Sequence, residues 1–121
     1  MLTLTLMKRI FLFFAVLIFS NPAFAQLRLM TYNIRYDNKD DGINQWSNRK
    51  QNVIAIIKKY KPDILGVQEA LVNQMAYIDS MLPDFDYAGV GRNDGKTKGE
   101  YSAVFYNKDK FTLLDKNTFW L

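Results

Sequence analysis

Apolar and polar residues follow one another along this chain in blocks that predict strands and helices in turn. The stretch Leu27–Ile34 is rich in apolar and β-favouring residues and predicts a strand, whereas the polar stretch Tyr36–Gln45 predicts a loop. The short, nearly all-apolar segment Asp63–Gln68 predicts a second strand whose two faces are both covered by other layers.

Two further segments space their apolar residues as helices do. The first helix is expected to start at Ser47, a suitable N-cap, and to run to about Tyr60, because Pro62 ends it. Its apolar face is expected to hold Val53, Ile56, Ile57 and Tyr60. The second helix is expected from about Leu71 to Leu82, with an apolar stripe of Leu71, Met75, Ile78 and Leu82.

The last third of the chain has the pattern of β-structure. Phe85–Val90, Tyr101–Tyr106 and Phe111–Leu114 are expected strands, and Gly91–Gly99 is expected to be a flexible hairpin loop between the first two. The order of strand, helix, strand, helix and three strands predicts an α/β fold, in which helices pack on a mixed sheet.

The N-terminus has the three parts of a secretory signal peptide. Lys8 and Arg9 form a basic region, residues 10–19 are an unbroken apolar run, and Ala23-Phe24-Ala25 supplies a small-residue cleavage pattern. Such a run spans about 15 Å as a helix, roughly half of a bilayer core, so no stable membrane anchor is expected. We expect residues 1–25 to be removed on export and residues 26–121 to reach the periplasm or the extracellular space.

The composition restricts the chemistry that the chain can perform. It has no histidine and no cysteine, which excludes a Ser-His-Asp triad, a thiol nucleophile, disulfides and a Cys-ligated zinc site within it. Carboxylates, amides and hydroxyls remain, and these oxygen ligands suit hard cations such as Mg²⁺. The predicted signal peptide holds two of the 16 basic residues and none of the 12 acidic ones. The remainder therefore carries only about +2, which gives no support for nucleic-acid binding.

Two loops resemble ligand-binding motifs but lack residues that those motifs require. Gly91–Thr97 has three residues between its glycines where a phosphate-binding loop has four, and it leads into a predicted strand instead of a helix. Asp37–Gly42 resembles the opening of an EF-hand, but Lys39 stands at a ligand position. We therefore expect neither a phosphate-binding loop nor a calcium site here.

Two polar residues at the ends of predicted strands are better candidates for a functional site. Asn33 lies at the end of the first predicted strand, and Glu69 directly follows the second. In open α/β sheets, residues just past the carboxyl ends of strands point into the crevice where ligands bind. A carboxylate there can bind Mg²⁺, and an amide beside it can orient a phosphate. The alternative is that both residues only begin loops, since polar residues end most strands.

Four blocks of the sequence resemble the endonuclease/exonuclease/phosphatase superfamily, whose fold is also called DNase I-like. They are Met30–Arg35, Trp46–Arg49, Pro62–Glu69 and Gly99–Tyr106, and their common order and spacing make the resemblance specific. A secreted bacterial branch is the most similar part of the superfamily. The resemblance implies that residues 26–121 are the N-terminal half of a four-layer α/β sandwich, in which mixed sheets are flanked by helices.

The resemblance also implies a hydrolase that cleaves phosphodiesters or phosphomonoesters with Mg²⁺ or Mn²⁺. Glu69 would be the principal metal ligand, and Asn33 would orient groups at the metal and at the scissile phosphate. Arg49, Gln68 and Glu100 would support the site from outside the inner ligand sphere. Nucleic acids, lipid head groups, inositol phosphates and sugar phosphates all remain open as substrates.

The rest of the family's site is expected to be missing. The family's second half supplies an Asp-x-Asn block and a late Asp-His pair, and we expect neither block after Glu69 in this chain. The first hypothesis is therefore a truncated phosphoesterase domain that is inactive as this fragment. The alternative is a non-catalytic secreted binding or structural module. A third hypothesis is that the chain does not fold stably alone, because a bare sheet face exposes apolar surface.

Overall fold

The computed structural model describes residues 3, 4, 8 and 26–120. Most of the predicted signal peptide, residues 1–25, lies outside the described residues. In the part of the chain that is described, no helix is both long and apolar enough to cross a membrane.

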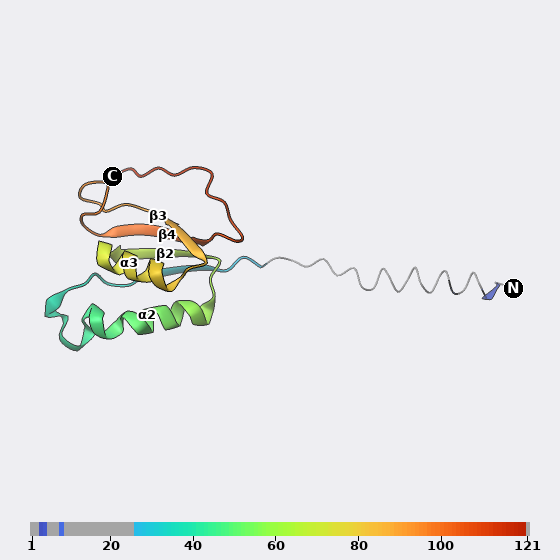
Figure 1. Ribbon diagram of the computed structural model, residues 1–121, viewed down its shortest axis with the longest axis horizontal. Coiled ribbons are helices and arrows are strands. Elements are labelled where there is room, and N and C mark those ends of the chain that lie inside the picture. The colour runs from blue at the N-terminus through green and yellow to red at the C-terminus, as the bar shows by residue number, and fades with distance from the viewer. Residues whose placement is uncertain (1–2, 5–7, 9–25, 121) are drawn as a thin grey trace.

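One mixed sheet of four strands, in the order β1-β2-β4-β3, organises the chain (Figure 1). Strands β1 and β2 run parallel with Asn33 opposite Gln68, and β4 runs antiparallel to both of its neighbours. The parallel pair needs a crossover connection, which the longer helix supplies. The elements in chain order are β1 (Leu29–Asn33), the 3₁₀ helix η1 (Lys39–Asn44), α2 (Trp46–Tyr60), β2 (Ile64–Ala70), α3 (Val72–Met81), β3 (Phe85–Ala88) and β4 (Tyr101–Asn107).

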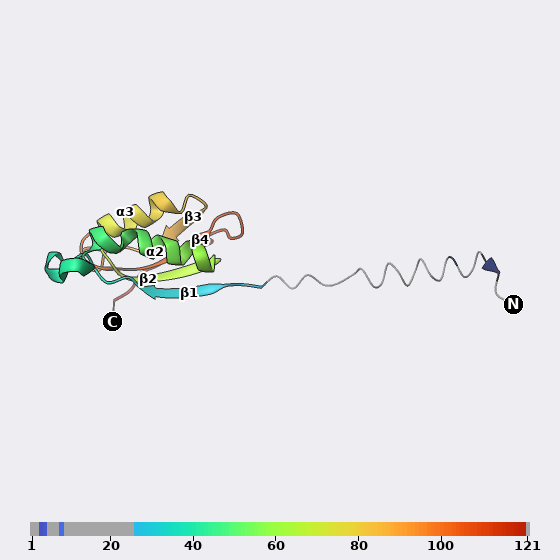
Figure 2. The same cartoon turned by 90° about the horizontal axis from the view of Figure 1, so that it is seen from below.

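Both α-helices lie on the same face of the sheet, as the view along the sheet shows (Figure 2). The core forms between them and the sheet, because alternate strand residues such as Val67 and Phe105 point to this face and are fully buried. On the opposite face, Leu29 is 69% and Val104 is 45% exposed. The sheet therefore has one packed face and one face that helices leave uncovered.

The first helix differs in detail from its prediction. Ser47 is not the N-cap, because α2 begins at Trp46, whose buried ring packs edge-on against Tyr77 at 5.8 Å. Ile56 and Tyr60 are exposed, and the buried residues of the helix are Trp46, Val53, Ile54 and Ile57. The buried face is rotated because α2 packs against α3 as well as against the sheet.

Two other expectations are corrected by the structure. Phe111–Leu114 is not a strand; residues 111–120 have no regular secondary structure, because their backbone does not pair with an edge strand of the sheet. The predicted loop Tyr36–Gln45 contains η1, whose first turn is capped where the Asn38 side chain accepts a hydrogen bond from the backbone N–H of Asp40 at 3.0 Å.

Candidate active site

The two candidate site residues meet at the carboxyl ends of neighbouring parallel strands. Asn33 is the last residue of β1, and Glu69 is the sixth of the seven residues of β2. The Asn33 side chain donates from Nδ2 to Oε1 of Glu69 at 2.7 Å. Asn33 is exposed and Glu69 is half-buried. The parallel register thus joins residues that are 36 positions apart in sequence.

The backbone at Glu69 departs from a regular strand. Its φ of 62° lies in the left-handed region, and the β2–β4 register shifts between Gln68 and Ala70. This is the geometry of a β-bulge, in which one residue is left out of the pairing and its side chain is turned. A non-glycine residue in this conformation costs about 1–2 kcal/mol, and such strain collects at functional sites. The bulge directs the Glu69 carboxylate toward Asn33.

The amide of Asn33 is held at both of its ends. While Nδ2 faces Glu69, Oδ1 accepts a hydrogen bond from the backbone N–H of Arg35 at 2.9 Å. Arg35 itself has a φ of 55°, and its guanidinium makes two 2.5 Å hydrogen bonds to the carboxylate of Asp41. This pairing lowers the pKa of Asp41 and raises the pKa of Arg35 above its ordinary value. The bidentate ion pair between Arg35 and Asp41 therefore links the turn after β1 to η1.

The three expected supporting residues occupy different places around this pair. Arg49 donates to backbone carbonyls of the turn after β1 and of η1, namely those of Ile34, Arg35 (2.7 Å), Tyr36 (3.2 Å) and Asn44 (2.7 Å). Gln68 bonds to the Thr31 hydroxyl on the helix-free face, and Glu100 forms an ion pair with Arg92 at 3.1 Å. Among the described residues, none of the three hydrogen-bonds through its side chain to Asn33 or Glu69. Arg49 shapes the turn after β1, whereas Gln68 and Glu100 bond to residues outside the pair.

The sequence matches one protein family over most of its length. The profile of the Endonuclease/Exonuclease/phosphatase family matches residues 30–118. The chain belongs to this family.

Solved structures of family members contain the same arrangement of strands and helices. The endonuclease/exonuclease/phosphatase from Bacteroides vulgatus is 52% identical, with a TM-score of 0.76 over 78% of this chain and 36% of that one. A mannosyl-6-phosphatase of Bacteroides thetaiotaomicron is 38% identical, with a TM-score of 0.73 over 76% of this chain and 35% of that one. An uncharacterised protein of Acanthamoeba polyphaga mimivirus is 27% identical over 78% of this chain and 16% of its own length.

The fold prediction is confirmed by these structures. The mixed sheet and its two helices match about a third of the family fold, and human nocturnin shares this fold at 21% identity with a TM-score of 0.60. The chain spans little more than a third of the length of the solved relatives.

The donor atoms at the pair fit the metal dependence of the endonuclease/exonuclease/phosphatase family. Mg²⁺ is usually held by one or two carboxylates, with water and substrate phosphate as its other ligands. Glu69 supplies one carboxylate at the strand ends, and Asn33 fixes its orientation by the 2.7 Å hydrogen bond. No group of three acidic side chains that could enclose an ion occurs among the described residues.

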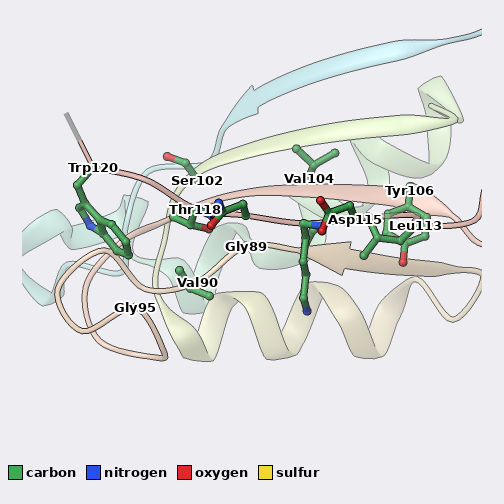
Figure 3. A pocket seen from close by; sticks show the side chains of 13 residues that line it. Gly89, Val90, Gly95, Ser102, Val104, Tyr106, Leu113, Asp115, Thr118 and Trp120 are labelled. Carbon is green, nitrogen blue, oxygen red and sulfur yellow. Dashed lines mark hydrogen bonds between the residues drawn. The ribbon is translucent and has the colours of Figure 1, made fainter.

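One expectation about the family's motifs is wrong, because Asp115-Lys116-Asn117 does have the Asp-x-Asn spacing. The structure places this triplet in the irregular C-terminal segment, where it lines a cavity of about 650 Å³ on the helix-free side of β3 and β4 (Figure 3). Ser102 and Trp120 also line this cavity, whereas Asn33 and Glu69 do not. The structure therefore does not bring the triplet into contact with the candidate pair.

Sequence reasoning missed one buried polar residue near the site. Gln74 on α3 is fully buried and makes hydrogen bonds to the turns that follow both β1 and β2. Gln74 lies three residues after Leu71 and next to Met75 in the sequence. This position is within the predicted apolar face of the helix, where a polar residue is not expected. A Gln at the third position of a helix is a known partner of the N-cap backbone, and this signal could have found it.

Proposed function

We propose that Asn33 and Glu69 form the metal-binding half of a metal-dependent phosphoesterase site, with Glu69 as the ligand of Mg²⁺ or Mn²⁺. The observation that carries the proposal is the 2.7 Å contact between Asn33 Nδ2 and Glu69 Oε1 at the ends of two parallel strands. Membership of the endonuclease/exonuclease/phosphatase family supports it. The left-handed bulge at Glu69 supports it further, since strain of this kind is kept where a side chain must be aimed.

In the reaction, water attacks phosphorus, the bond from phosphorus to the leaving oxygen breaks, and a proton passes to that oxygen. A divalent cation, when bound, would supply positive charge to the phosphate oxygens and activate the attacking water. Glu69 would hold such a cation through its carboxylate. Asn33 keeps that carboxylate in one orientation and presents an amide where charge develops on the phosphate. The chain has no histidine, so the proton transfers need groups other than a histidine of this chain.

The substrate class that we propose is a sugar phosphomonoester. Support comes from the mannosyl-6-phosphatase, whose sequence is 38% identical to this chain over 76% of this chain's length. The modest net charge of the region after the predicted signal peptide also agrees better with a small anionic substrate than with a nucleic acid. We further propose that the signal peptide of residues 1–25 directs the protein to the periplasm or beyond.

A titration with Mn²⁺, followed by electron paramagnetic resonance of the free ion, tests the metal assignment. Glu69→Gln removes the carboxylate charge but keeps the side-chain size, so we expect Mn²⁺ affinity to fall roughly tenfold or more. Glu100→Gln is the matched control, because Glu100 pairs with Arg92 instead of Asn33, and its affinity should stay close to that of the wild type. Equal affinities of Glu69→Gln and the wild type, or no binding by the wild type, would refute the proposal.

A chimera tests the activity. Residues 29–118 can replace the matched third of the mannosyl-6-phosphatase, and hydrolysis of mannose 6-phosphate can be followed as released phosphate. We expect the chimera to be active and Glu69→Gln in it to lose activity by on the order of 100-fold or more. An active chimera that tolerates Glu69→Gln would show that this carboxylate does not hold the metal.

A further inference from the structure

Gln74 is the most unusual polar residue in the core. It lies on α3 beside the apolar residues Met75 and Ile78 of the buried face and has an exposed fraction of 0%. A buried amide is costly unless its donor and acceptor atoms are paired. Both ends of this amide are paired, and all its partners are backbone groups of two particular turns.

The hydrogen bonds of Gln74 join the turns that follow β1 and β2. Its Oε1 accepts from the backbone N–H of Asp37 at 2.9 Å and from that of Leu71 at 3.0 Å. Its Nε2 donates to the carbonyl oxygen of Arg35 at 2.9 Å. Arg35 and Asp37 belong to the turn after β1, and Leu71 directly follows β2. One side chain thus fixes the ends of both strands relative to each other.

Each of these turns follows a strand that has one member of the candidate pair at or near its end. On the β1 side, the carbonyl oxygen of Arg35 accepts the hydrogen bond from Gln74 Nε2. The backbone N–H of Arg35 in turn donates to Asn33 Oδ1 at 2.9 Å. On the β2 side, Leu71 lies two residues after Glu69, whose bulged backbone ends the regular pairing. The path from Gln74 to either site residue therefore crosses at most two residues.

The geometry points to Gln74 as the positioning residue that sets the Asn33–Glu69 contact, an inference that rests on the proposed function of that pair. Arg49 also donates to the carbonyl of Arg35, but all its backbone partners lie between residues 34 and 44. Arg49 can shape only the first turn. Gln74 bonds to both turns, and together with the 3.2 Å hydrogen bond from the Ile34 N–H to the Gln68 carbonyl it sets the distance between them.

The test uses nuclear magnetic resonance of the chain, because hydrogen-bond scalar couplings report the individual contacts without any metal or substrate. In the wild type, couplings should link Gln74 to Arg35, Asp37 and Leu71, and Asn33 Nδ2 to Glu69. Gln74→Met keeps the volume and removes all three hydrogen bonds. We expect it to abolish the Asn33–Glu69 coupling and to speed hydrogen exchange of the Asn33 amide roughly tenfold or more.

A matched control is the neighbouring residue Asn73, which is exposed and whose side-chain amide donates to the Asp37 carboxylate at 2.9 Å. Asn73→Ala should leave the Asn33–Glu69 coupling unchanged. Gln74→Glu, in its ionised form, keeps both acceptor contacts but has no donor for the Arg35 carbonyl, so the coupling should weaken. A residue with only a general structural role would lower the melting temperature without moving this signal in the folded protein.

The outcomes separate the positioning role from the proposed function. A Gln74→Met protein with native methyl dispersion and an intact Asn33–Glu69 coupling would overturn the inference. If Gln74→Met does not fold, an intact Asn33–Glu69 coupling in Gln74→Glu would overturn the inference in the same way. If neither variant folds, the test is the set of wild-type couplings from Gln74 to Arg35, Asp37 and Leu71. Their absence would overturn the inference. A wild type that shows all the couplings but binds no Mn²⁺ would refute the proposed function and leave the geometry of Gln74 standing.

Discussion

Replacing Arg49 by Met should destabilise the protein strongly even though the side chain is only half-buried. The guanidinium donates to four backbone carbonyls of the turn after β1 and of η1. It also lies 5.4 Å from the Trp46 ring centroid. Met keeps the aliphatic stem and removes every donor, so the carbonyl groups must find other partners.

The size of the effect follows from which carbonyls can reach water. Ile34 is 2% exposed, and a buried acceptor left without a partner costs about 1–3 kcal/mol. The carbonyls of Arg35 and Asn44 belong to exposed residues and that of Tyr36 to a half-buried one. These three can be rehydrated, which limits their combined loss to about 1 kcal/mol. We expect a total of about 2–4 kcal/mol, which lowers the melting temperature of a domain of this size by roughly 10–30 °C.

Urea unfolding followed by tryptophan fluorescence measures this loss. Arg49→Lys keeps the charge but not the planar fork, and it should recover only part of the stability. Lys50→Met is the control, because Lys50 lies over the Tyr77 ring at 5.0 Å and should cost less than about 1 kcal/mol. A folding free energy for Arg49→Met within about 0.5 kcal/mol of the wild type, the range of ordinary surface changes, would refute the reasoning.

Three further changes test the core, an ion pair and the bulge. Phe105→Ala empties a fully buried ring position and should cost about 3–5 kcal/mol in urea unfolding, whereas Val104→Ala on the exposed face should cost far less. The Lys110 hydrogen bond of 2.5 Å is the main reason why the pKa of Asp63 lies below its ordinary value of 3.8. Stability from this carboxylate is therefore present above that pH and is lost as the pH falls through the lower, folded-state pKa. The stability difference between wild type and Lys110→Met should be largest near neutral pH and shrink in acid, and a constant difference would contradict the assignment. Because of the φ of 62°, Glu69→Gly should be more stable than Glu69→Ala by about 1 kcal/mol, and calorimetry that ranks them the other way would exclude the strain argument.

Much of the fold could be predicted because burial leaves a periodic signature in the sequence. The strand around Val67 and the helix around Ile78 are apolar at most of the positions that the structure buries. The helix α3 lies within its predicted limits, whereas β2 continues to Ala70, two residues past its predicted end. Asn33 and Glu69 could be proposed because strand ends and their chemistry are visible in one dimension. Their contact needed only the parallel register that a strand-helix-strand unit implies.

The features of the fold and of the site that could not be predicted depend on contacts between residues that lie far apart in the sequence. The bulge at Glu69 exists only relative to β4, so no local pattern announces it. The buried role of Gln74 comes from two turns that are distant from each other along the chain. Phe111–Leu114 has the composition of a strand, but composition cannot supply the neighbouring backbone that a strand needs.

The parallel pairing of β1 with β2 has a consequence for the order of folding events. Asn33, Glu69 and the side chains that fasten their turns all lie between residues 33 and 74. The contact cannot form until one long loop, with α2 inside it, has closed, and closing such a loop carries an entropic cost before any contact rewards it. Formation of α2 shortens that loop. The rate at which the pair assembles should therefore be governed by this single closure, and substitutions that stabilise α2 alone should accelerate it.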